Sequence, residues 1–252
     1  RRTADFVLTH LRRDGVLLRR YRDGEARYPG TLEDYAFLSY GLLELYEASF
    51  EPRDLAEVKA LVAQMVERFW DDARGGFFLR SRKEPALIGH AKEVRDGATP
   101  SGNSLAALVL LRLGRLTGDE RLETLGRRTL DTFAATAAAE PFGYPQLLIA
   151  WDFALGPTKE IVIAGDPASP QTLALTQAVR ERFLPRAVTL LHLPGPSGAA
   201  LEAIAPFVKT QGLLKGQPPV YVCEHFVCRL PVTTVEELKG LLDDTRRPAH
   251  EP

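Results

Sequence analysis

Apolar residues recur at helical spacing through most of the first 156 residues of the chain. Four long segments have this pattern, and a shorter one follows Pro145. The long segments cover residues 31–50, 54–70, 105–116 and 120–139. Because the breaks within each pair are only a few residues long, the pattern predicts antiparallel helical hairpins.

The pattern changes near Gly156 and Pro157, where short apolar runs begin to alternate with helical segments. The runs at residues 159–164, 187–194 and 218–223 are typical of buried strands. We therefore predict a mainly α chain in three parts. These are helical hairpins over residues 1–156, a small α/β segment with a mostly parallel sheet over 157–245, and a disordered tail over 246–252.

Two shorter regions complete the helical part. Turn-forming Asp-Gly and Pro-Gly pairs in residues 14–30 predict a short hairpin or an extended loop, and residues 71–81 predict a second small hairpin. Residues 1–13 are amphipathic, as in the last turns of a helix. Because the chain starts inside such a pattern and without Met, we expect it to be a fragment of a larger protein.

The composition is that of an ordinary globular protein, with 45% hydrophobic and 26% charged residues in a chain of 252. The 32 basic and 33 acidic residues nearly cancel, so no broad basic field attracts nucleic acid, and we expect no nucleic-acid partner. No apolar run approaches the roughly 20 residues that span a bilayer, so we expect no membrane association. Two cysteines make no disulfide framework, which favours the cytoplasm.

The segment KEVRDGATPSGNS, residues 92–104, is the densest in charge and backbone freedom. It carries two charges of each sign and two glycines, and an apolar helix follows it directly. Ser101, Asn103 or Ser104 is placed to cap that helix, whose first N–H groups would face the charged loop. The segment is therefore either a solvated helix start or a place that holds an oxygen-rich ligand.

Five segments of the chain resemble one family, in the same order. They are LEDYAFLSYGLLELYEASF, FWDDARGGFF, KEVRDGATPSGNS, EIVIAGDP and YVCEHFVCRLP. The family is the thioredoxin-domain-containing proteins related to spermatogenesis-associated protein 20, and the resemblance covers nearly the whole chain. The combination of DGATPSGNS with LEDYA is its most specific part.

The resemblance implies a fold class and a larger protein. Members of this family have a thioredoxin-like N-terminal domain followed by an (α/α)6-type barrel similar to N-acylglucosamine 2-epimerases and other six-hairpin enzymes. This chain would then be a partial toroid of helical hairpins followed by the small α/β segment, and the thioredoxin-like domain would be a partner within the same protein. One residue departs from the expected pattern, since His90 stands where we expect an arginine.

The resemblance also implies a pocket with acidic residues at one end of the toroid. Two carboxylates in unlike environments, one protonated and one ionised, suit general acid–base chemistry on a sugar. The candidate catalytic residues are Asp34, Glu93 and Asp96. The candidate substrate-binding residues are Glu33, Tyr35, Lys92, Ser101 and Asn103.

Structural roles compete with these assignments. Asp34 is also a first-turn acid that suits a helix dipole, and Asp96 is also a turn residue that bonds its own backbone. Trp151 and Phe78 are either a platform for a sugar ring or part of the core. The histidines have no metal-ligand spacing and no glycine-rich phosphate loop is present, so we expect neither a metal nor a cofactor.

The cysteine pair is a second chemical signal. Cys223 and Cys228 are separated by four residues, which differs from the spacing of thioredoxin-type pairs. They form a reversible disulfide, bind a metal together with His225 and a fourth ligand, or pack as small apolar side chains.

Two hypotheses for function follow. The first is that the chain binds or processes a carbohydrate-like small molecule with acidic residues as acid and base. The alternative is a non-catalytic or thiol-redox regulatory module in which Cys223 and Cys228 are the switch.

Overall fold

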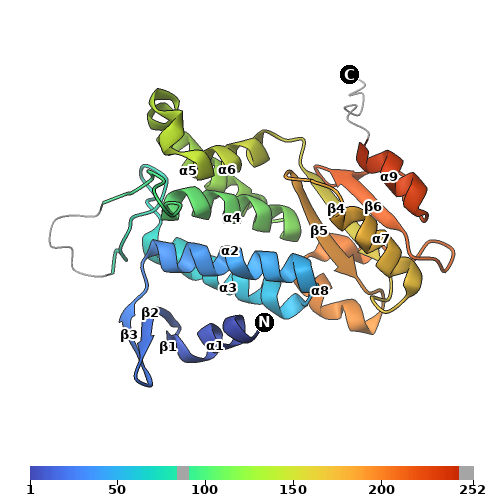
Figure 1. The fold of residues 1–252 in the computed structure, drawn as a ribbon, viewed down its shortest axis with the longest axis horizontal. Helices are drawn as coiled ribbons and strands as arrows, with labels where there is room; N and C mark the ends of the chain where they lie inside the picture. Colours follow the sequence, from blue (N-terminus) through green and yellow to red (C-terminus); the bar gives the residue numbers. More distant parts are fainter. Residues whose placement is uncertain (84–90, 244–252) are drawn as a thin grey trace. The chain divides into compact units, whose positions relative to one another are not determined.

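The computed structural model describes residues 1–83 and 91–243. They form two compact units (Figure 1). The first contains residues 1–115 and 119–156, and the second contains residues 116–118 and the chain from Pro157 onward. The predicted disordered tail, residues 246–252, lies outside the described residues. The chain is mainly α-helical with two small sheets, in agreement with the coarse prediction.

The first unit begins with a helix and a three-stranded antiparallel sheet. The elements are α1 (Arg2–His10), β1 (Arg12–Arg13), β2 (Val16–Arg22) and β3 (Glu25–Pro29), with the strands in the order β1-β2-β3. Gly15 and Gly24 have positive φ in the two turns, a conformation that glycine adopts without steric cost. The region predicted as a hairpin or an extended loop is therefore a small sheet with two tight turns.

The first helical hairpin consists of α2 (Leu32–Ser49) and α3 (Pro52–Phe69). Each helix buries one apolar stripe, which is why the helical spacing was visible in the sequence. Phe50 adopts the left-handed conformation that ends α2, and Pro52 occupies the first turn of α3, where its missing N–H has no cost. The two helices lie side by side in Figure 1.

The second hairpin consists of α4 (Gly102–Thr117) and α5 (Glu120–Ala139), and α6 (Pro145–Leu155) follows after the 3-10 turn η1 (Pro141–Gly143). Every residue from Ser101 to Thr117 is buried. A Cβ at Gly126 of α5 would come within 2.8 Å of the Leu111 side chain of α4. The glycine therefore allows these two helices to pack closely.

The small hairpin predicted over residues 71–81 is reduced to one antiparallel bridge between Trp70 and Phe77. The N–H of Phe78 still donates to the carbonyl of Phe69 over 2.8 Å, but the N–H of Leu79 donates to the carbonyl of Ala91 over 2.9 Å. That partner could not be read from the local sequence.

The second unit contains a four-stranded sheet in the order β5-β4-β6-β7. Its strands are β4 (Lys159–Ala164), β5 (Ala187–His192), β6 (Val220–Glu224) and β7 (Val227–Cys228). Only the β4–β5 pair is parallel, whereas β4–β6 and β6–β7 are antiparallel. The prediction of a mostly parallel sheet was therefore wrong. Between β5 and β6 the chain forms short helical pieces, η2 (Pro196–Gly198), α8 (Ala199–Ile204) and η3 (Pro206–Thr210), instead of a full crossover helix.

The core of this unit lies between the sheet and two helices, α7 (Pro170–Arg180) and α9 (Val235–Asp243). Its buried residues come from strands β4 and β6 and from both helices. They are Ile161, Ile163, Leu175, Ala178, Val179, Val220, Val222, Leu238 and Leu242. Within residues 1–83 and 91–243, no helix combines the length and apolar character needed to cross a membrane.

Candidate functional site

Asn103 lies near the end of the 92–104 segment. Its side chain makes its hydrogen bonds to the backbone of other parts of the chain. Its side chain is fully buried. The Oδ1 atom accepts from the N–H of Phe77 over 2.7 Å, and Nδ2 donates to the carbonyls of Phe77 over 2.9 Å and Glu93 over 2.8 Å. Asn103 therefore ties three parts of the chain together, namely the turn after α3, the segment itself and the start of α4.

The carboxylate of Asp96 also accepts hydrogen bonds from other parts of the protein. One carboxylate oxygen accepts from the N–H of Ser101 over 2.8 Å, and the other accepts from the N–H of Gln146 over 2.9 Å, with Leu147 at 3.4 Å. These donors belong to the starts of α4 and α6, where N–H groups lack partners within the helix. The geometry supports a capping role for Asp96 more directly than proton transfer.

Ser101 and Lys92 of the segment also bond to groups of the protein. The Ser101 hydroxyl accepts from the N–H of Ser104 over 3.1 Å and caps α4. Lys92 forms an ion pair with Asp71 over 2.7 Å, and its hydrogen bond lowers the pKa of that carboxyl. The Lys92 ammonium also lies 5.1 Å from the ring centre of Phe78. The segment is thus a structural junction.

At the start of α2, Asp34 and Tyr35 also make structural contacts. The Asp34 carboxylate accepts from the N–H of Thr31 over 2.7 Å and from its hydroxyl over 3.0 Å, which completes a capping box. Tyr35 is fully buried, and its hydroxyl accepts from the N–H of Leu17 over 3.0 Å. The ring of Tyr35 packs edge-on against Phe69.

Glu33 differs from its neighbours. It is half-buried, and burial raises its pKa, with further contributions from the negative charges of Glu93 and Asp34. Arg19 opposes this rise. The structure therefore brings the predicted residues Glu33, Asp34 and Glu93 into one electrostatic group, although two of them begin α2 and the third lies in the segment before α4.

A hollow of about 340 Å³ lies next to this group. It is lined by Arg19, Tyr28, Pro29, Gly30, Thr31 and Arg80. Arg19 joins the two features, because its Nε lies 4.0 Å from the carboxylate of Asp34. The sequence reasoning missed Arg19, Tyr28 and Arg80, since only the turn signal at Pro29-Gly30 marked this place.

Tyr28 has an unusual backbone conformation at the edge of the hollow. Its φ is 66°, a region that residues with a large side chain rarely adopt, and 55% of its surface is exposed. The guanidinium of Arg20 lies 5.1 Å from the centre of its ring. Such backbone outliers gather at binding sites, where the surrounding structure holds them in place.

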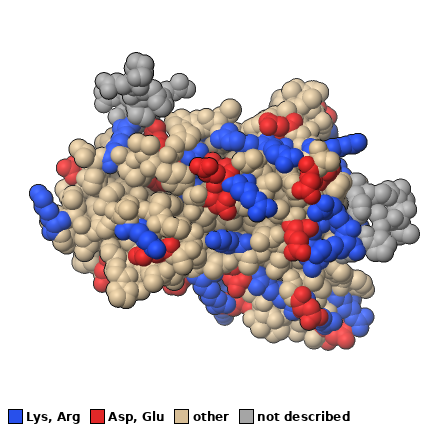
Figure 2. Space-filling model, turned by 180° about the vertical axis from the view of Figure 1, so that it is seen from behind, with Lys and Arg blue, Asp and Glu red and all other residues tan. Residues whose placement is uncertain are grey.

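Other predicted features lie away from this hollow or outside the description. Trp151 and Phe78 are half-buried and are not among its lining residues. His90 lies outside the described residues. Within those residues, no group of three or more histidine, cysteine, aspartate or glutamate side chains is placed to hold a metal ion. Basic and acidic side chains are interspersed over the face shown in Figure 2.

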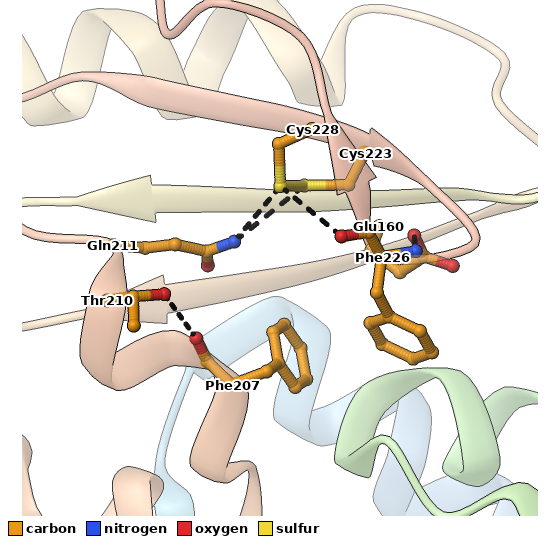
Figure 3. Close-up of a disulfide and its surroundings, with 7 residues drawn as sticks. All are labelled: Glu160, Phe207, Thr210, Gln211, Cys223, Phe226 and Cys228. Atoms are coloured by element: carbon orange, nitrogen blue, oxygen red, sulfur yellow. Dashed lines mark hydrogen bonds between the residues drawn. A yellow bond between two sulfur atoms is a disulfide. The ribbon is translucent and has the colours of Figure 1, made fainter.

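The cysteine pair forms a disulfide in the second unit (Figure 3). Cys223 and Cys228 face each other across β6 and β7, with Cα atoms 3.8 Å apart. Of the three possibilities that the sequence left open, the structure has the disulfide.

The described residues form a mainly α-helical unit with a small hollow beside the start of α2, and an α/β unit. Over 214 residues the chain is 37% identical to spermatogenesis-associated protein 20 of Homo sapiens and 36% identical to the protein of that name from Rattus norvegicus. It is also 27% identical over 215 residues to an uncharacterized protein of Caenorhabditis elegans. No family model matches the chain.

The chain is thus related to spermatogenesis-associated protein 20 over 84% of its own length. The matched region spans only 27% of the human and rat proteins, so most of each relative has no counterpart here.

Proposed function

We propose that the helical unit binds a carbohydrate or related polyol that carries an anionic group, in the hollow at the start of α2. The observation that carries the proposal is the grouping of Arg19, Tyr28 and Arg80 around a space of about 340 Å³. That volume is near the lower end of the roughly 300–1,000 Å³ found for small-molecule sites. A monosaccharide is the appropriate size.

Tyr28 offers an exposed ring on which the apolar face of a sugar can stack. The φ of 66° sets the direction of the Cα–Cβ bond of Tyr28, and the Arg20 guanidinium 5.1 Å from the ring centre restricts the rotation of the ring. A preorganised aromatic side chain loses little conformational entropy when a ligand binds. This role replaces the one considered for Trp151 and Phe78.

Arg80 provides the preference for an anionic group. It is exposed, and it has no ion-pair partner among the residues that the structure describes. Arg19 forms an ion pair with Asp34 and interacts with the charge of Glu33. Its guanidinium is therefore better placed to orient hydroxyl groups of the ligand than to bind the anionic group. A guanidinium suits carboxylate and phosphate because it presents paired donors in one plane.

Glu33, Asp34 and Glu93 lie beside the hollow and are not among its lining residues, and of the three we propose Glu33 as the proton donor. Burial raises its pKa, while the Asp34 carboxylate accepts hydrogen bonds from the N–H and the hydroxyl of Thr31 and pairs with Arg19 at 4.0 Å. Two neighbouring carboxyl groups in unlike environments are the arrangement that acid–base chemistry requires. We assign proton donation to Glu33, charge stabilisation to Asp34 and Glu93, and a structural role to Asp96.

Three further statements about the whole protein belong to this proposal. The helical hairpins are part of an (α/α)6 toroid, the protein includes a thioredoxin-like domain, and it works in the cytoplasm. The resemblance of the five sequence segments supports the first two, and the length of the relatives leaves room for both. The small number of cysteines supports the third.

Thermal unfolding in the presence of glucose, glucuronate, glucose 6-phosphate or inorganic phosphate tests the proposal. A ligand present at 100 times its Kd stabilises the folded state by about 2.7 kcal/mol, a shift of a few degrees in Tm. We expect glucuronate or glucose 6-phosphate to stabilise more than glucose.

Arg80→Ala should weaken binding of the anionic sugars by about tenfold or more, because a bond to a charged group is lost. Arg22→Ala is the matched control, since Arg22 is an exposed arginine of β2 that pairs with Asp23 and does not line the hollow. If no sugar stabilises the intact protein, or if both variants weaken binding equally, the proposal is wrong.

A further inference from the structure

We propose that Cys223 and Cys228 are a redox-active pair that exchanges two electrons with an external dithiol, and that the Gln211 amide favours the reduced state. This site lies wholly in the second unit, and it involves none of the residues of the sugar proposal. Three features of the hairpin carry the inference: the exposure of its two sulfur-bearing residues, the hydrogen bonds of Gln211 and the backbone of the turn.

The two cysteines differ in exposure. Cys228 is exposed at the edge of the sheet, whereas only 1% of Cys223 is accessible. Thiol–disulfide exchange begins with attack of a thiolate on an accessible sulfur. The geometry therefore makes Cys228 the sulfur that is attacked and Cys223 the leaving group.

The exchange balances without any further reactant. A thiolate of the dithiol attacks Sγ of Cys228, the bond between the two cysteines breaks, and Cys223 leaves as a thiolate. The second thiolate of the reagent then attacks its own sulfur in the mixed disulfide and releases Cys228. The reagent becomes a disulfide, two electrons pass to the cysteine pair, and the two protons of the dithiol end on Cys223 and Cys228.

The side chain of Gln211 has different hydrogen-bond partners in the disulfide and dithiol states of the cysteine pair. Its Nε2 atom donates to Sγ of Cys228 over 3.4 Å and to Sγ of Cys223 over 3.7 Å (Figure 3). Its Oε1 atom is buried and has no hydrogen-bond partner within the described part of the chain. Disulfide sulfurs only accept, but a thiol also donates. Reduction adds S–H donors beside this amide, and a rotation of the amide would bring its orphaned oxygen toward them.

The position of Gln211 is fixed independently of the sulfurs. Its backbone carbonyl bonds to Nδ1 of His192 over 2.8 Å, and the other ring nitrogen of His192 lies 3.1 Å from Glu202. Only 5% of Gln211 is exposed. The unsatisfied oxygen therefore cannot reach water without a local opening, and an unpartnered buried acceptor destabilises the disulfide state.

The backbone of the turn between β6 and β7 also favours opening of the disulfide. His225 and Phe226 have φ of 52° and 61°, although such turns favour asparagine and glycine at these positions. The turn is held by the disulfide and by the N–H of Phe226, which donates to the buried carboxylate of Glu160 over 3.0 Å. The Phe226 ring also packs edge-on against Phe207. Opening the bridge removes one of these constraints.

The test is equilibration of the intact chain with mixtures of reduced and oxidised dithiothreitol, followed by thiol alkylation and mass spectrometry. We expect the wild-type bridge to open and close reversibly while the circular dichroism spectrum stays native. Glutathione, a monothiol, should be trapped on Cys228. If the bridge does not form, opens only when the protein unfolds, or traps glutathione on Cys223, the proposal is wrong.

Gln211→Leu tests the role of the amide, because it replaces both the orphaned oxygen and the Nε2 donor with an apolar side chain. We expect the equilibrium to move toward the disulfide by about tenfold. Gln211→Met provides the same test if the leucine variant does not fold. Tyr221→Phe is the control, since it removes a neighbouring hydrogen bond to Gly212 and leaves the sulfurs untouched. A shift in Gln211→Leu no larger than that in the control, or one toward the dithiol, overturns the role of Gln211.

Discussion

The 92–104 segment and the hollow at the start of α2 both concentrate charge near a helix start, but they use their polar groups differently. In the segment, the side chains of Lys92, Asp96 and Asn103 all bond to groups of the protein itself. Around the hollow, Tyr28 and Arg80 are exposed. Charge density therefore does not identify a binding site unless some of the polar groups remain available to a ligand.

Asn103→Ala gives the largest expected effect, because it would convert the junction into a set of unpaired buried groups. We expect it to lower the free energy of unfolding by about 3 kcal/mol, since the N–H of Phe77 and the carbonyl of Glu93 lose their partner. Urea unfolding measures this. Gln177→Ala, which shortens an exposed amide side chain, should change stability by less than about 0.5 kcal/mol.

Asp96→Asn should cost about 1–2 kcal/mol, because an amide cannot accept from donors on two helix starts as a carboxylate does. If the variant still binds the anionic sugar with wild-type affinity, Asp96 and the 92–104 segment are separate from the ligand site. Loss of binding in a folded Asp96→Asn protein would return the ligand site to the 92–104 segment.

Tyr28→Gly should separate stability from binding. Glycine adopts a positive φ freely, so relief of the backbone compensates for the lost contact with Arg20. We expect a free energy of unfolding within about 1 kcal/mol of the wild type, together with loss of the sugar-induced Tm shift. A variant that retains the shift would show that Tyr28 does not contact the ligand.

The smallest expected effect concerns Glu33 and pH. Its pKa is higher in the folded than in the unfolded state, so its contribution to stability is present below the unfolded value and is lost as pH rises through the folded value. Because the group is partly solvated, the change should stay below about 0.5 kcal/mol. Glu33→Gln should remove this pH dependence above about pH 4.5, which urea unfolding across a pH series would show.

Local sequence pattern was sufficient for the main helices. The apolar stripes of α2 and α3 could be recognised from nearby positions alone. The direction of β6 could not be recognised, because it depends on which side of β4 the chain returns to after a series of short turns. The same limit applied to Asn103, whose main partner, Phe77, is 26 residues away.

The sequence singled out only some of the residues in and beside the hollow, for a similar reason. The sequence singled out Glu33, Asp34 and Glu93, and the structure places their charges together. It did not reveal Arg80, which lies about 50 positions from Tyr28 and reaches the hollow only through the fold. Nor did the sequence show that Asp96 would accept a hydrogen bond from the N–H of Gln146 at the start of α6.

The most direct test of the central claim is a titration of the isotope-labelled chain with glucose 6-phosphate, followed by amide NMR. If the hollow is the ligand site, the largest chemical-shift changes occur at Tyr28, Gly30, Thr31 and Arg80, and Tyr28→Gly abolishes them. If the largest changes instead occur at residues 92–104 and persist in Tyr28→Gly, the segment is the site and the account is contradicted.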